Sequence, residues 1–198
     1  MSAFVALTIY LKALVYTKCK NKRKLCYFKS MNNNFKEKRQ PENIELRRTI
    51  DRLLQEGTVF IEQNFKALDI TSYRYEMREA VEELSLDEDT VYQLVEDYII
   101  QILKSNITFY EYIQELEIDE LENRVLDYTN IKNLAHKNLG VARNLRIKDA
   151  EKILKIIIHK EDSNYLKLCI KALEISAVKL NPLCAYETLK LIQVKNSL

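Results

Sequence analysis

The sequence predicts an all-α fold, and three observations support this expectation. The 198 residues include only two glycines and two prolines, whereas sheets and loop-rich folds need many more turn residues. Long stretches repeat apolar residues at the i, i+3, i+4 spacing of a helix. The segments between these stretches are short, as in antiparallel bundles. We therefore expect an antiparallel four-helix bundle with an additional N-terminal helical segment.

The N-terminal part of the chain differs from the rest in charge. Residues 1–50 hold 12 Lys and Arg against 3 Asp and Glu, whereas the remainder holds 19 against 26. A mildly acidic body argues against nucleic acid as the main partner, because binding a phosphate backbone needs a basic face. We expect residues 1–40 to be a basic leader that is disordered or lies upstream of the true start.

The leader contains an apolar stretch, Ser2–Tyr16, that is too short to span a bilayer comfortably. Its basic run follows the apolar stretch, opposite to the order in a secretory signal. Three interpretations stay open: residues 2–29 anchor the chain at a membrane surface, they form a packed helix, or translation truly begins at Met31.

The four cysteines match no metal-site spacing. We expect free thiols, with Cys169 in the core, and a reducing compartment, and we assign the protein to the cytoplasm.

Residues 41–72 are expected to form a helical extension that begins at Pro41 and is interrupted at Gly57. The main body, 73–198, begins with a short helix near Tyr73. Ser85 or Asp87 then caps a long helix that reaches about residue 117.

Polar residues divide the rest of the body into helices. The long helix is expected to bend or loosen around Ser105 and Asn106. Further helices follow at 131–147, at 148–160 with Asp149 or a residue near it as the cap, and after Asp162 up to Pro182. A short helix near 184–194 closes the chain.

The helix at 131–147 carries the candidate site. Its buried stripe is expected to comprise Ile131, Leu134, Ala135, Val141, Ala142 and Leu145. Lys132, His136, Gly140 and Arg143 then face outward together. Glycine inside a helix costs about 1 kcal/mol relative to alanine, so we interpret Gly140 as clearance for a second body beside the His136 imidazole. The alternative is an ordinary surface histidine and a glycine used for helix packing.

The stretch "LAHKNLGVARNLRI" resembles the signature of the histidine phosphotransfer (HPt) family, A-H-x-x-K-G-x-[AS]-x-x-[LI]. The matching residues are Ala135, His136, Gly140, Ala142 and Leu145. The preceding "LSLDEDTVYQLVEDYIIQIL" resembles the acidic, capped helix that begins such domains, and the likeness covers about residues 73–195. The resemblance implies an HPt-like four-helix bundle whose exposed histidine carries a phosphoryl group between receiver-domain aspartates in a two-component phosphorelay.

The chain departs from this signature at Asn138 and Leu139, where the family has an apolar residue and then Lys. Asn138 faces the core and needs a hydrogen-bond partner there. Leu139 replaces a cation that steadies the phosphate, and Lys137 is the best substitute.

The resemblance gives the site residues their expected roles. His136 is the phosphoacceptor, Lys137 stabilises the phosphate and Gly140 gives clearance for the receiver. Leu139 and Gly140 are expected to form an apolar contact patch. The patch is ringed by cations, and the partner-binding set is Lys132, Leu139, Arg143 and Arg146.

The expected partners are receiver domains of response regulators or hybrid histidine kinases. The receiver would supply Mg²⁺, so no cofactor or metal is expected in this chain. A nucleotide-binding signature is lacking in the sequence, which indicates a phosphoryl carrier rather than an autonomous kinase. His159, at a helix end, is interpreted as structural. Two alternatives stay open: a non-catalytic helical adaptor that binds receivers, and a membrane-associated helical scaffold.

Overall fold

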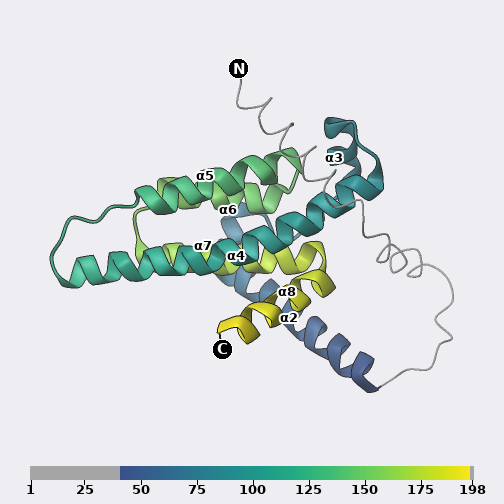
Figure 1. The fold of residues 1–198 in the computed structure, drawn as a ribbon, viewed down its shortest axis with the longest axis horizontal. Coiled ribbons are helices and arrows are strands. Elements are labelled where there is room, and N and C mark those ends of the chain that lie inside the picture. The colour runs from purple at the N-terminus through teal and green to yellow at the C-terminus, as the bar shows by residue number, and fades with distance from the viewer. Residues whose placement is uncertain (1–40, 197–198) are drawn as a thin grey trace. The chain divides into compact units, whose positions relative to one another are not determined.

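The computed structural model describes residues 41–196, which form helices and the segments that connect them, without any strand. The chain divides into two units, residues 1–43 and 44–198. The leader, with its possible membrane segment at 2–29, lies outside the described residues. The helices are α2 (Pro41–Phe65), η1 (Lys66–Leu68), α3 (Met77–Leu84), α4 (Glu88–Leu121), α5 (Thr129–Asn144), α6 (Lys148–His159), α7 (Ser163–Leu180) and α8 (Pro182–Asn196) (Figure 1). The all-α expectation is confirmed.

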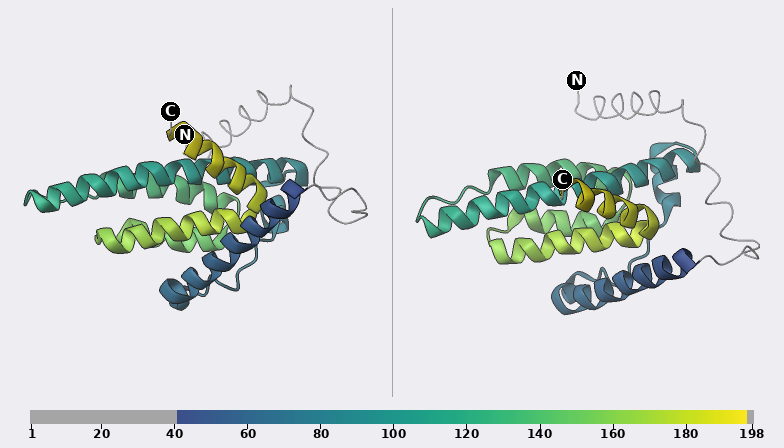
Figure 2. Two further views of the ribbon diagram at one scale, coloured as in Figure 1. Left: turned by 90° about the horizontal axis from the view of Figure 1, so that it is seen from below. Right: turned by 60° about the horizontal axis from the view of Figure 1, so that its bottom comes forward.

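Four helices enclose the main core of this unit. α4 packs against α5 and α7, and α6 packs against the same two helices. Both views in Figure 2 show these helices side by side. Wholly buried aliphatic and aromatic side chains fill the space between them, and include Ile99, Ile102, Phe109, Ile113, Ile153, Leu154, Ile157, Leu166 and Leu173. Removal of this apolar surface from water is the main stabilising contribution.

Two of the expected helix caps are present. The Asp87 carboxylate accepts a hydrogen bond from the Thr90 backbone N–H at 2.8 Å, and the Asp162 carboxylate accepts one from the Tyr165 N–H at 2.9 Å. Each satisfies a backbone donor that the first helical turn leaves without a partner. The expectation for Asp149 is only partly right, because Ile147 occupies the N-cap position of α6. Asp149 lies within the first turn and is buried.

The expected interruption at Gly57 is wrong, because α2 continues through it. A Cβ atom at this position would lie 2.8 Å from Cγ2 of Ile175 on α7. The missing side chain therefore lets α2 approach α7 closely. The rings of Phe65 and Tyr165, with centroids 5.9 Å apart, continue the contact near the end of α2. Gly57 is therefore a packing glycine. The contact with Ile175, which is distant in sequence, explains the absence of a side chain at this position, and the local sequence does not.

The expected loosening around Ser105 and Asn106 is also absent, because α4 runs unbroken to Leu121. Both side chains bond to other helices instead of disturbing their own backbone: Ser105 to Asn138, and Asn106 to the Ile170 carbonyl at 3.4 Å. None of the described helices has the length and apolar character needed to cross a bilayer.

Candidate functional site

His136 and Gly140 are exposed on the same side of α5, one turn apart. The opposite side of the helix contains Ile131, Ala135 and Ala142, which are buried. This arrangement follows from the apolar spacing of the helix and agrees with the outward orientation expected for His136. The hydrogen bonds and ion pairs found among the described residues leave the imidazole without a partner. The ring is therefore open to water and to another molecule.

Gly140 has no packing function within the described part of the chain. A Cβ atom added there would meet no heavy atom within 4 Å. This environment is the reverse of that at Gly57, where a Cβ would collide with Ile175. Helix α5 therefore bears the conformational cost of a mid-helix glycine without an internal contact that requires it.

Asn138 is completely buried and finds the partners that its polarity requires. Its Oδ1 accepts a hydrogen bond from Gln101 Nε2 at 3.0 Å. Its Nδ2 donates to the Leu134 carbonyl at 2.9 Å and to Ser105 Oγ at 3.3 Å. Two residues along a helix correspond to a rotation of about 200°, so a side chain fixed to α4 at 138 directs position 136 away from the core. The expected hydrogen-bond partner for Asn138 is confirmed.

Leu139 does not form part of the exposed surface, and this expectation has to be corrected. The residue is 4% exposed. It lies one turn after Ala135, which is wholly buried, so the helical repeat turns position 139 inward as well. Val141 is half-buried. The surface beside His136 is therefore formed around Gly140 without the Leu139 side chain.

Three of the four cations expected around the site are paired with carboxylates. Lys132 forms an ion pair with Glu161, and Arg143 Nε lies 3.1 Å from Oε1 of Glu151. The same Glu151 carboxylate lies 2.7 Å from Lys155 Nζ, and the hydrogen bonds from Lys155 and then Arg143 lower its pKa.

Lys137 differs from the other three cations. It is exposed, and within residues 47–192 its ammonium group has no ion-pair partner. It follows His136 directly in the sequence, and it is the remaining free positive charge among the four cations expected at the site.

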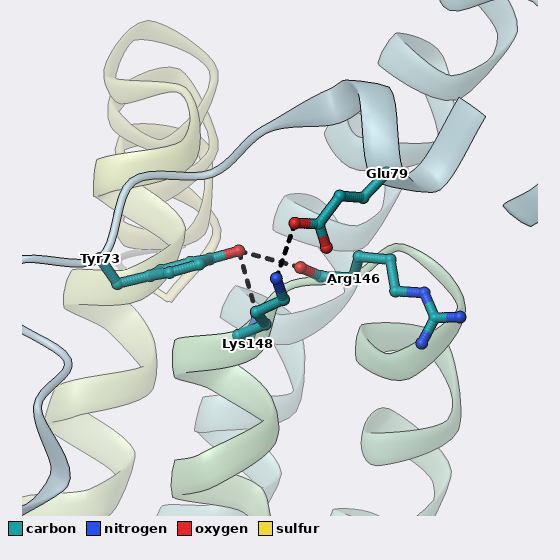
Figure 3. A network of polar contacts seen from close by, with 4 residues as sticks. All are labelled: Tyr73, Glu79, Arg146 and Lys148. Carbon is teal, nitrogen blue, oxygen red and sulfur yellow. Dashed lines mark hydrogen bonds and ion pairs between the residues drawn. The ribbon is translucent and has the colours of Figure 1, made fainter. Parts of the chain in front are cut away.

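Arg146 belongs to a network at the turn between α5 and α6, which Figure 3 shows from close by. The Tyr73 hydroxyl donates to the Arg146 carbonyl at 2.9 Å and accepts from the Lys148 N–H at 3.2 Å, and burial raises the pKa of Tyr73 to about 12. The Arg146 guanidinium lies 2.6 Å from Glu83 of α3, and Lys148 Nζ lies 2.7 Å from Glu79. Arg146 therefore holds α3 against this turn, a contact that is formed within the chain.

The other histidine and the cysteines in the described residues lack the features of a reactive site. His159 is the exposed last residue of α6. Cys169 is buried and Cys184 half-buried, and both are free thiols, as expected. Burial raises the pKa of Cys169 to about 12 and that of Cys184 to about 11, which leaves few nucleophilic thiolates at neutral pH. Among the residues that the structure describes, His, Cys, Asp and Glu form no group of three or more that could hold a metal ion.

The sequence analysis missed the carboxylates Glu83, Glu151 and Glu161. They are separated in sequence from the cations that they pair with, so helical periodicity within one segment gives no sign of them. Only Glu151 had a local signal, because it follows Arg143 by eight residues across a tight turn between two helices. Comparisons of the chain with protein-family models, with curated proteins and with solved structures find no match.

Proposed function

We propose that this chain is a histidine-containing phosphotransfer protein, in which His136 carries a phosphoryl group between receiver-domain aspartates of a cytoplasmic phosphorelay. In this proposal, α4, α5, α6 and α7 correspond to the antiparallel four-helix bundle of the HPt family. The observation that carries the proposal is the pair His136 and Gly140: an exposed imidazole beside a glycine for which the described packing has no use.

The proposed reaction is an in-line transfer from an aspartyl phosphate to an imidazole nitrogen. The nitrogen lone pair forms the N–P bond while the O–P bond breaks, and the bonding electrons stay on the aspartate carboxylate. The imidazole proton passes to solvent. Such transfers depend on alignment and on neutralisation of charge more than on covalent work by the acceptor. The receiver would supply Mg²⁺, and the chain would supply the nucleophile and its clearance.

Lys137 is the proposed source of positive charge for the transferred group. Position 139, where the HPt pattern has Lys, is a buried leucine here, so it offers no charge. Lys132 and Arg143 are each engaged by a carboxylate. A single exposed ammonium on a flexible stem neutralises a phosphoryl group less completely than two cations would, and we expect transfer to be slow for this class of protein.

Transfer from a receiver tests the proposal directly. The full chain is incubated with receiver domains from its source organism that have been phosphorylated with a radioactive label. The expected product is a phosphate on the chain that is labile in acid and stable in base. His136→Gln should abolish the label, whereas His159→Gln, which changes the other histidine at an exposed helix end, should retain it. Persistent labelling of His136→Gln would refute the assignment.

A non-catalytic receiver-binding adaptor is the second candidate, and one observation favours it. The HPt cation is missing at position 139, and a buried aliphatic side chain occupies its place. In this case receivers bind the α5 surface without transferring label. Binding that His136→Gln leaves unchanged, together with an unlabelled wild-type chain, would select the adaptor over the carrier.

A further inference from the structure

Two ion pairs define one edge of the exposed surface of α5. Lys132 pairs with Glu161, which follows α6, and Arg143 pairs with Glu151 in the first turn of α6. Eleven residues separate Lys132 from Arg143, which corresponds to about 16 Å along the helix axis. His136 and Gly140 lie between them. Both pairs face α6, and they lie near opposite ends of the exposed part of α5.

The two carboxylates change what this edge offers to a partner. Lys132, Arg143 and Lys155 would give this edge three positive charges, but Glu151 and Glu161 cancel two of them. An incoming carboxylate would have to displace Glu151, whose Oε1 lies 3.1 Å from Arg143 Nε. The negative charge of Glu151 would also repel it. Complementary charges mainly determine the rate of encounter and the choice of partner, while like charges suppress the wrong partner.

We propose that Glu151 and Glu161 are specificity-determining residues of the His136 surface. They weaken the attraction of the α6 edge for acidic partner surfaces, and they favour receivers whose contact surface opposite this edge is neutral or basic. The inference rests on the proposed phosphotransfer function and adds the electrostatic class of partner to it. It replaces the expectation of a freely positive ring around His136 with an α6 edge whose positive charge is largely cancelled, and with one unpaired cation, Lys137, outside that edge.

The experiment compares two double variants with the same change in net charge. Glu151→Gln/Glu161→Gln frees the cations of the α6 edge. Glu62→Gln/Glu187→Gln removes two exposed carboxylates on α2 and α8, outside this edge, and serves as the matched control. Ion pairs at the surface contribute about 1 kcal/mol or less each, and Lys132 and Glu151 are only half-buried, so all variants should remain folded, which thermal unfolding would verify.

The quantity to measure is the bimolecular rate of label transfer from phosphorylated receivers, at about 0.02 M and about 0.3 M ionic strength. With a receiver whose contact surface is acidic, Glu151→Gln/Glu161→Gln should be faster than wild type by about threefold or more at low ionic strength. The gain should disappear at high ionic strength. A receiver with a neutral or basic contact surface should gain nothing, and the control variant should behave like wild type.

The outcomes separate this inference from the function on which it rests. If the wild-type chain is labelled but the two double variants give the same rates and salt dependence, the specificity assignment is wrong and the carrier function stands. Equal acceleration with acidic and basic receivers would also overturn it, because the effect would then not be electrostatic selection. If none of the receivers labels His136 in the wild-type chain, the phosphotransfer proposal fails and this inference fails with it.

Discussion

Gly140→Ala should stabilise the folded chain, although it changes a residue of the candidate site. Alanine is about 1 kcal/mol more favourable than glycine inside a helix, and the new methyl group would meet no atom within 4 Å. The full propensity difference should therefore appear in the free energy of unfolding. For a domain of this size, it corresponds to a rise in Tm of about 2–4 °C.

Gly57→Ala provides the matched control, because the same substitution meets the opposite environment. The methyl group would lie 2.8 Å and 3.3 Å from two side-chain carbons of Ile175. Ile175 is β-branched and buried in a helix, so its χ1 rotamer has little freedom to change. Overpacking of this kind costs about 1–3 kcal/mol. After the gain in helix propensity, we expect a net loss of about 0–2 kcal/mol.

Two measurements on both variants test the reasoning. Urea and thermal unfolding, followed by circular dichroism, should place Gly140→Ala above wild type and Gly57→Ala at or below it. Label transfer from a phosphorylated receiver should slow for Gly140→Ala, because the methyl group occupies the space proposed for the receiver. A Gly140→Ala variant that unfolds more readily than wild type would refute the packing argument. A more stable variant with unchanged transfer would remove clearance as the reason for this glycine.

Two further predictions concern buried polar side chains. Burial raises the pKa of Asp149, so ionisation of this carboxyl group opposes folding. Its contribution to stability is favourable below the pKa that it has in the unfolded chain, and this contribution is lost as the pH rises through its pKa in the folded chain. Asp149→Asn should therefore raise Tm more at pH 8 than at pH 4, and an equal shift at both would contradict this. Asn138→Ala should lower the free energy of unfolding by about 1–3 kcal/mol. A double-mutant cycle with Ser105→Ala should show a coupling of at least about 0.5 kcal/mol if their hydrogen bond fixes α5 against α4.

The parts of the fold that depend on local sequence were predictable. The helical class, the caps at Asp87 and Asp162, and the outward direction of His136 all follow from periodicity and from the chemistry of nearby side chains. The core position of Asn138 and its need for a partner were predictable for the same reason. The partners themselves, Gln101 and Ser105 on α4, were not, because they depend on how two distant helices align.

Most of the corrected expectations share a cause, which is contact between different helices. Gly57 looks like a helix breaker until Ile175 is placed against it. Arg143 and Arg146 look like free surface cations until α6 and α3 bring Glu151 and Glu83 to them. The error at Leu139 is different, because the helical repeat from Ala135 already indicated a buried position. There the family pattern, which has a cation at that position, predicts an exposed side chain and conflicts with the periodicity.

The burial of Leu139 and the exposure of Lys137 determine which side of α5 can supply charge to a phosphoryl group on His136. One residue along a helix is a rotation of about 100°, and three residues are about 300°. Lys137 and position 139 therefore flank His136 on opposite sides. Arg143 and Lys132 lie on the side that faces α6, where carboxylates already neutralise them. The free charge is on the side toward α4. In the proposed phosphotransfer, a receiver that uses this charge must approach with its phosphoryl group displaced toward α4, so Lys137→Ala should slow label transfer more than Arg143→Ala does.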